Sequence, residues 1–188
     1  MNQALLILSG PIAAGKSTVA KFLREKHGFL RVSSSQFLTE LAKSRCQAPT
    51  RKVLQDLGDM LDIETDYTWL VDDVVFPQMA ANPARDWFVD AIRKRQQADK
   101  FKARLPSTCH IHFTASDATL KSRFDARLSA SGVSSHEPST YEKTIKHPNE
   151  IAARSLGLIA DLIIDLDQVD SEEAAEIAAH TCRGKSNA

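Results

Sequence analysis

The stretch that decides the fold is Gly10-Pro11-Ile12-Ala13-Ala14-Gly15-Lys16-Ser17, which reads GPIAAGKS. It matches the pattern G-x-x-x-x-G-K-[ST] at every fixed position. A continuous apolar run at 4–8 precedes it, and apolar residues at helical spacing follow it over 15–26. The glycines let the backbone curl so that successive N–H groups point at phosphate oxygens, at the favourable end of the helix dipole. The stretch therefore predicts a phosphate-binding loop between a strand and a helix.

Each polar side chain of this loop has an expected partner. Lys16 is expected to reach the β- and γ-phosphates, the Ser17 hydroxyl to ligate Mg²⁺, and Thr18 to contact the α-phosphate. The expected nucleotide-binding residues are Gly10, Ala13, Ala14, Gly15, Lys16, Ser17 and Thr18. The alternative is a chance match on a structural turn, which the strand–loop–helix context disfavours.

Short apolar runs alternate with helical patterns along the rest of the chain. Strands are predicted at 4–8, 29–32, 87–89, 109–113 and 162–164. Helices are predicted at 15–26, 35–44, 50–63, 67–79, 94–102, 117–128 and 172–179. This alternation predicts an α/β fold of the three-layer P-loop NTPase type, with a five-stranded, mainly parallel sheet, helices on both faces and a small lid. Ligands of such sheets bind at the carboxyl ends of the strands.

Several element boundaries are predicted from single residues. Pro77 should kink or end the helix over 67–79 because it lacks a backbone N–H. Ser116-Asp117 and Ser171 are expected to cap the helices that follow them. The Ser-rich stretch 130–138 reads as a loop, and 182–188 is expected to be frayed.

Composition bounds the function. The 188 residues predict one domain, and the 24 basic and 24 acidic residues cancel, which removes any whole-molecule electrostatic attraction to nucleic acid or membrane. No apolar stretch approaches the roughly 20 residues that span a bilayer, and the apolar start lacks the basic flank of a signal peptide. Three cysteines far apart in the sequence fit reduced thiols better than disulfides or a zinc site. We therefore expect a cytoplasmic protein without a membrane partner, as a monomer or homodimer.

The class of phosphate-loop protein is narrowed by what the sequence lacks. It contains no Asn-Lys-x-Asp for guanine recognition and no second, transporter-like signature, and it is too short for a ring-forming ATPase with its lid domain. The remaining class is a compact kinase with an acceptor-binding helical segment at about 33–80 and a lid at about 123–150. A single kinase domain over 1–188 is therefore expected.

The residues after the third predicted strand point to acceptor chemistry. Asp90 follows the strand directly, where a carboxylate can orient Mg²⁺ through water or bind the acceptor hydroxyl, and phosphoryl transfer depends on that placement. Arg93 can hold a phosphate or carboxylate through two parallel hydrogen bonds. The alternatives are a helix N-cap for Asp90 and a solvated surface arginine for Arg93.

Two arginines precede the predicted lid. Arg123 and Arg127 are four residues apart, hence on one helical face, and can stabilise the charge that develops on the transferring group. The alternative is a solvated basic face paired with Asp117 and Asp125.

The predicted acceptor segment offers further candidates. Ser34, Ser35, Arg51 and Gln55 are expected to line the acceptor site, although the serines of 33–35 can instead cap a helix. Trp69, Tyr67 and Phe76 can stack on a base but fill cores more often. His110 and His112 alternate on one strand and face one side of the sheet, where hydrogen-bonded histidines under a helix are favoured over a metal pair.

Taken together, these motifs resemble the nucleoside and deoxynucleoside monophosphate kinase-like P-loop proteins over nearly the whole chain. The resemblance is carried by 10–18 as the phosphate loop, 32–38 at the acceptor side, 50–58 as Arg-x-x-Leu-Gln-x-x-Gly, 89–93 as Val-Asp-Gly-Ile-Arg, 123–127 before the lid and 160–164 as the last strand. The sequence departs from the pattern at Gln36, where Asp is frequent, at Ala91, where Gly is common, and at His147-Pro148, where Arg-Asp is often seen.

The resemblance implies an ATP-dependent phosphotransferase that uses ATP·Mg²⁺ and phosphorylates a nucleoside or deoxynucleoside monophosphate-like acceptor. The catalytic residues expected are Lys16, Asp90, Arg123 and Arg127, with Ser17 and Asp90 at the metal. One alternative is a kinase of hydroxymethylated bases in DNA, as in a viral branch of the family. Its basic track would be Lys94, Arg95, Lys100, Lys102 and Arg104. A second alternative is a nucleotide-binding regulator without chemistry.

Overall fold

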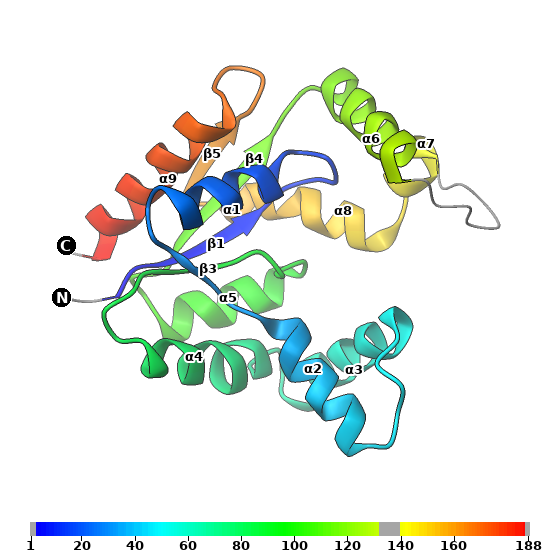
Figure 1. Ribbon diagram of the computed structural model, residues 1–188, viewed down its shortest axis with the longest axis vertical. Helices are drawn as coiled ribbons and strands as arrows, with labels where there is room; N and C mark the ends of the chain where they lie inside the picture. Colours follow the sequence, from blue (N-terminus) through cyan, green and yellow to red (C-terminus); the bar gives the residue numbers. More distant parts are fainter. Residues whose placement is uncertain (1–2, 132–139, 187–188) are drawn as a thin grey trace.

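Five parallel strands form one sheet in the order β2-β3-β1-β4-β5 in the computed structural model, which describes residues 3–131 and 140–186 (Figure 1). The strands are β1 (Leu5–Ser9), β2 (Leu30–Arg31), β3 (Trp87–Val89), β4 (Cys109–Thr114) and β5 (Leu162–Asp165). Strand β1 is central, and its residue Leu6 is in register with Phe88 of β3 and Cys109 of β4. All five predicted strands are confirmed. Every pairing is parallel, so their carboxyl ends lie at one edge of the sheet.

Alternate residues of β1 bury opposite faces of the sheet, which explains its uninterrupted apolar sequence. Leu6 and Leu8 belong to a core shared with α1 (Lys16–Glu25) and α9 (Ser171–Ser186). Leu5 and Ile7 belong to a second core on the other face. That core is shared with α2 (Ser34–Ser44), α3 (Arg51–Glu64), η1 (Leu70–Val75), α4 (Phe76–Ala81) and α5 (Arg95–Arg104). The three-layer α/β architecture is therefore confirmed.

The chain between β4 and β5 forms α6 (Asp117–Ser131), α7 (Tyr141–Thr144), α8 (Pro148–Ser155) and η2 (Leu156–Ile159). Helices α6 and α7 lie side by side and away from the sheet in Figure 1. As predicted, the Ser116 hydroxyl caps α6 by accepting from the Thr119 N–H. The helix continues to Ser131 rather than ending at Leu128. Residues 132–139 of the predicted loop and lid lie outside the described residues.

The segment around Pro77 differs from its prediction in two ways. Asp66 and Tyr67 have positive φ angles of 48° and 63°, so the helix begins after them rather than at Tyr67. The turns over Leu70–Val75 are a π-helix that leads directly into α4, and Pro77 occupies the first turn of α4. A first-turn N–H has no partner within the helix, so Pro77 is tolerated where the helix changes type.

The carboxyl-terminal helix corrects two predictions. It is capped by Asp170, whose Oδ1 accepts from the N–H groups of Glu172 and Glu173, rather than by Ser171. It also runs to Ser186, and Cys182 is fully buried on it, so the expectation of fraying from 182 is wrong for 182–186. Residues 187–188 lie outside the described residues.

His110 and His112 lie on the same face of β4, as predicted, and both hydrogen-bond to one hydroxyl. The Ser9 Oγ lies 2.7 Å from His110 Nε2 and 2.9 Å from His112 Nδ1. Burial lowers the pKa of each histidine to about 4. The ring of His112 packs under Gly157 of η2, which confirms hydrogen-bonded histidines beneath a helix. Among residues 3–131 and 140–186, no three potential ligands form a metal-binding group.

The helices described in this structure include none that is both long enough and apolar enough to cross a membrane.

Candidate active site

The predicted phosphate loop links the carboxyl end of β1 to α1. Gly10 and Gly15 have φ angles of +141° and +94°, and a Cβ at Gly10 would lie 2.3 Å from the Phe113 carbonyl oxygen of β4. Ala13 also has a positive φ, 63°. Ser17 and Thr18 are exposed in the first turn of α1. The loop therefore has the curled backbone that the motif predicts, pressed against the neighbouring strand.

Lys16 is folded over this loop. Its Nζ donates to the carbonyl oxygens of Gly10 at 2.5 Å and Pro11 at 2.8 Å. The pKa of Lys16 is lowered to about 8, mainly by burial and also by the charges of Arg93 and Arg127, whereas Glu150 and Asp90 act in the opposite direction. These four side chains come from three separate parts of the sequence. Two sequence-predicted arginines and Asp90 are thus brought electrostatically close to Lys16.

Glu150 is a residue of this site that the sequence reasoning missed. It lies in the first turn of α8, is 8% exposed, and accepts a hydrogen bond from the Ile12 N–H of the phosphate loop at 2.8 Å. His147 caps the same helix by accepting from the Asn149 N–H, and Pro148 follows at its start. His147-Pro148, where the sequence differs from the family pattern, is therefore the start of a helix. Because proline favours the first position of a helix, Pro148 was the signal that could have predicted Glu150 in its first turn.

Asp90 follows β3 and is not a helix cap, because α5 begins only at Arg95. Its Oδ1 accepts from Arg31 Nε at 3.1 Å and pairs with Arg31 Nη2 at 3.1 Å. Arg31, at the end of β2, was also missed. Its signal was its place near the carboxyl end of the strand predicted at 29–32, at the same sheet edge as Asp90.

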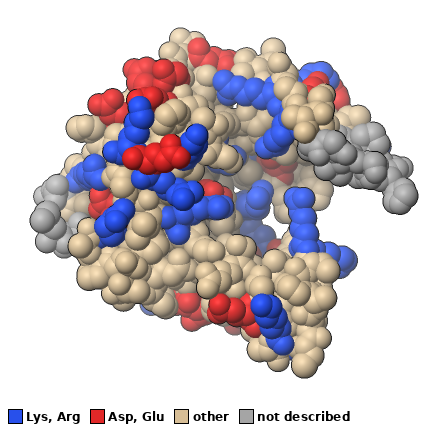
Figure 2. Space-filling view, in the orientation of Figure 1, with Lys and Arg blue, Asp and Glu red and all other residues tan. Residues whose placement is uncertain are grey.

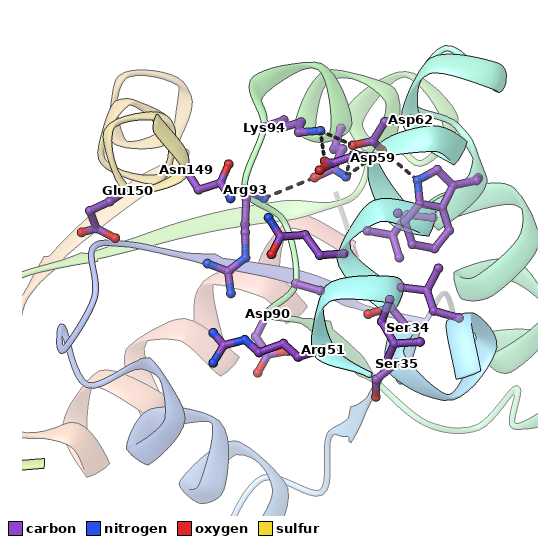
Figure 3. Close-up of a pocket in the computed structure, with 18 of the residues that line it drawn as sticks. Ser34, Ser35, Arg51, Asp59, Asp62, Asp90, Arg93, Lys94, Asn149 and Glu150 are labelled. Atoms are coloured by element: carbon purple, nitrogen blue, oxygen red, sulfur yellow. Dashed lines mark hydrogen bonds and ion pairs between the residues drawn. The ribbon is translucent and has the colours of Figure 1, made fainter. Parts of the chain in front are cut away.

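A cavity of about 570 Å³ opens beside these residues, between α2, α3, the loop after β3 and α8. All six residues predicted to bind the acceptor line it: Ser34, Ser35, Arg51, Gln55, Asp90 and Arg93. Figure 3 shows the guanidinium groups of Arg51, from α3, and Arg93, from the loop after β3, directed into the same space. Neither guanidinium forms an ion pair with another described residue. In Figure 2, basic side chains gather around the hollow at the centre of the molecule.

The serines in this wall do not act as caps. Ser33 occupies the N-cap position of α2, but its hydroxyl makes no capping hydrogen bond. Its backbone N–H donates instead to the Gln78 side chain at 3.1 Å. The capping alternative is therefore wrong, and the side chains of Ser34 and Ser35 face the cavity.

The aromatic candidates are mainly structural. Trp69 is 4% exposed, stacks on Phe37 at 5.9 Å and donates from Nε1 to Asp62 at 2.7 Å. Tyr67 lies under Lys94, with 5.8 Å between the ammonium and the ring centre. Phe76 does not line the cavity. The core alternative is confirmed for Trp69, although this residue also lines the cavity.

The two arginines on α6 approach the phosphate loop. Arg123 Nη2 donates to the Leu166 carbonyl at 3.2 Å, and its other terminal nitrogen would lie 3.8 Å from a Cβ at Gly15. Arg127 is exposed, and its charge reaches Lys16. Asp117 pairs with Arg154, and no ion pair joins either arginine to Asp117 or Asp125 within the described structure. The role of the two arginines therefore stays a prediction.

The predicted basic track is neutralised. Its ion pairs are Lys94 with Asp59 and Asp62, Arg95 with Asp99, Lys100 with Asp66, Lys102 with Asp161, and Arg104 with Asp72. A side chain already paired with a carboxylate releases fewer counterions from a phosphate backbone. These five residues do not form an uncompensated basic surface.

The fold and the loop together define the class of protein. A glycine-rich loop with Lys16 at the carboxyl edge of a parallel sheet, beside a cavity lined by arginines, is the arrangement of a P-loop phosphotransferase. A family model described as AAA domain matches residues 5–146, and the chain belongs to this family.

Relatives narrow the class to kinases. An adenylate kinase of Hyphomonas neptunium is 26% identical over 181 residues, which are 93% of this chain and 96% of that protein. An adenylate kinase of Flavobacterium johnsoniae is 28% identical over 136 residues, 68% of each chain. The protein is a P-loop kinase of the nucleoside monophosphate kinase-like group.

Solved structures show the same fold. A sugar kinase from Janibacter superimposes with a TM-score of 0.55 at 15% identity, over 97% of this chain and 95% of that chain. A putative kinase from Chloroflexus aurantiacus gives a TM-score of 0.54 at 15% identity, over 98% of both chains. At such identities these two likenesses support the architecture alone.

Proposed function

We propose that this kinase transfers the γ-phosphoryl group of ATP to a nucleoside or deoxynucleoside monophosphate-like acceptor. The observation that carries the proposal is the position of Arg93. It lines the cavity and its charge also acts on Lys16, so it joins the acceptor space to the phosphate loop. An anionic group at that junction would be held between Arg93 and Arg51, each free to bind two phosphate oxygens at once.

The donor would be held by the loop from Gly10 to Thr18. Its residues fit a triphosphate, because positive φ angles at Gly10, Ala13 and Gly15 give the curled backbone that an anion-binding loop needs. Lys16 would leave the carbonyls of Gly10 and Pro11 for phosphate oxygens. A bound Mg²⁺ would be held by the Ser17 hydroxyl and, through water, by Asp90; it would neutralise charge on the phosphates.

The acceptor would be placed by the segment 33–80 and the loop after β3. Ser34, Ser35 and Gln55 would contact its uncharged part, and an oxygen of the acceptor's phosphate would be placed for attack beside Asp90, which would act through the Mg²⁺ and its water. Arg123 and Arg127 would approach the transferring group from the lid at 123–150 and offset the charge that develops there. The whole chain would act as one kinase domain with ATP and Mg²⁺.

The two alternatives are less well supported. Phosphorylation of a base within DNA would need a free basic track, and the five candidate residues are paired with carboxylates. A regulator without chemistry would have no need for two arginines that face the cavity beside Asp90 and form no ion pair within the described part of the chain. A free monophosphate acceptor accounts for both observations.

The test is transfer of label from γ-labelled ATP to a panel of ribo- and deoxyribonucleoside monophosphates and to DNA containing hydroxymethylated bases. We expect a labelled diphosphate and unlabelled DNA. Lys16→Ala should lower turnover by at least about 10²-fold, the scale of a lost charge-stabilising donor in a dry site. Lys21→Ala, on the exposed face of the same helix, should keep full turnover.

Label in DNA alone would contradict the proposed acceptor. Turnover by Lys16→Ala close to that of the Lys21→Ala control would contradict the assignment of the loop.

A further inference from the structure

Gln97, in the first turn of α5, holds the loop that carries Arg93. Its side chain is 6% exposed, and its Oε1 accepts from the Arg93 backbone N–H at 3.2 Å. At the other end of the amide, Nε2 donates to Asp62 Oδ1 at 2.9 Å and Oδ2 at 3.3 Å. Both ends of the Gln97 amide are therefore used within the protein, on the wall of the cavity.

Asp62 determines which way this amide points. Its carboxylate is 2% exposed and, when ionised, only accepts hydrogen bonds. It also accepts from Trp69 Nε1 at 2.7 Å and Lys94 Nζ at 2.8 Å (Figure 3). The Gln97 nitrogen must face this carboxylate, which leaves the Gln97 oxygen to face the Arg93 N–H. A flipped amide would set donor against donor at the Arg93 end and acceptor against acceptor at the Asp62 end.

The chain of contacts connects the two arginines of the cavity. Asp62 lies on α3, the helix that begins at Arg51, and Gln97 connects it to the backbone of Arg93. Two walls that come from different parts of the sequence are thus joined by buried hydrogen bonds. A clamp made of two guanidinium groups works only if the distance between them is fixed.

We infer that Asp62 and Gln97 are positioning residues that orient Arg93 toward Arg51, so that the pair grips the acceptor's phosphate. The inference rests on the proposed function. Both residues lie on the cavity wall, but both ends of the Gln97 amide are already used within the protein. Their effect on phosphate binding passes through the Arg93 backbone.

A reciprocal exchange separates positioning from a merely structural role. In Asp62→Asn, the new amide nitrogen competes with the donors around it, and Gln97 turns its oxygen toward position 62 and its nitrogen toward the Arg93 N–H. In Gln97→Glu, two carboxylates face each other across one buried contact. In the double variant, the new amide at position 62 can donate to the new carboxylate at position 97. That carboxylate can still accept from the Arg93 N–H.

We expect each single variant to raise the acceptor KM by roughly tenfold, about the effect of one misdirected hydrogen bond. The KM for ATP should stay unchanged. The double variant should recover an acceptor KM within about threefold of the parent protein. Protonation relieves the paired carboxylates, so the defect of Gln97→Glu should deepen as pH rises, and the double variant should show no such trend.

Asp86→Asn is the matched control, because Asp86 accepts from the Ala4 N–H and from Arg183 at the opposite edge of the sheet. It should lower the unfolding temperature without changing the acceptor KM. An unchanged acceptor KM in the single variants would overturn the inference. So would a double variant whose acceptor KM rises by at least the product of the two single-variant increases.

Binding without turnover separates this inference from the proposed function. Calorimetry would measure the dissociation constant of each nucleoside monophosphate in the panel without ATP. If no phosphoryl transfer occurs but monophosphate affinity falls in both single variants and returns in the double variant, the positioning role stands and the kinase assignment fails. Transfer with no such pattern in KM or affinity overturns the positioning role alone, and no monophosphate binding by the parent protein overturns both.

Discussion

Gly10 shows how one backbone position fixes the phosphate loop. Its φ of +141° lies where residues with a side chain are strained, and a Cβ there would meet the Phe113 carbonyl oxygen at 2.3 Å. Backbone of β4 cannot retreat without breaking its pairing to β1. The glycine is therefore required by packing between strands as well as by the curl of the loop.

Gly10→Ala should lower the free energy of unfolding by roughly 3 kcal/mol, because it adds backbone strain to a steric overlap. Gly184 is a matched control on α9, with nothing within 4 Å of a Cβ. Gly184→Ala should leave stability unchanged or raise it by up to about 1 kcal/mol. Urea unfolding of both variants is the measurement, and equal effects would contradict the packing argument.

The sequence predicted those site residues whose signal is local. The phosphate loop is one continuous motif, and Asp90 and Arg93 follow a clear apolar strand. Glu150 was not predicted because its partner Ile12 is 138 residues away in the sequence. Arg31 was not predicted because its partner Asp90 is 59 residues away. Such contacts depend on how strands are ordered in the sheet, which residue patterns along the chain do not specify.

At the scale of elements, the apolar periodicity predicted the strands and most helices, whereas helix ends depended on tertiary contacts. The α9 helix persists past 182 because Cys182 is buried and Lys185 donates to the Thr108 carbonyl. The segment before η1 is bent because Asp66 and Tyr67 have positive φ angles. Neither position is a glycine, the residue that would have indicated such a turn. Propensity alone cannot predict either feature.

The cap of α9 gives a test at this scale. Asp170→Ala should lower the free energy of unfolding by about 1 kcal/mol, because two N–H groups lose their acceptor. Ser171→Ala should change it by less than about 0.5 kcal/mol, as expected for a residue that is not the cap. Chemical denaturation compares them directly, and a larger loss in Ser171→Ala would show that the cap is assigned to the wrong residue.

At the scale of the whole molecule, parallel strands bring the polar residues that follow them to one edge of the sheet. This explains why residues from the ends of β1, β2 and β3 meet around a single cavity. The same arrangement places Ser9, His110 and His112 between the sheet and η2, directly behind the phosphate loop.

The buried histidines should make the fold sensitive to acid. Their folded-state pKa of about 4 is below the ordinary 6.5, so the unfolded chain binds protons first as pH falls. Their contribution is complete above about pH 6.5 and is lost toward pH 4, by up to roughly 3 kcal/mol for each histidine.

Urea unfolding measured between pH 7 and pH 4.5 tests this effect. His112→Gln should flatten the pH dependence, whereas His180→Gln, at an exposed position of α9, should leave it as steep as in the parent protein. An unchanged slope in His112→Gln would exclude His112 as a source of the pH dependence.

The central claim is that the turn between β1 and α1 holds the phosphates of a nucleotide. The most direct measurement is a crystal structure of the protein with Mg²⁺ and a non-hydrolysable ATP analogue. We predict phosphate oxygens within hydrogen-bond distance of the loop amides and of Lys16 Nζ, which will have left the carbonyls of Gly10 and Pro11. An analogue bound elsewhere, with Lys16 still on those carbonyls, would contradict the account.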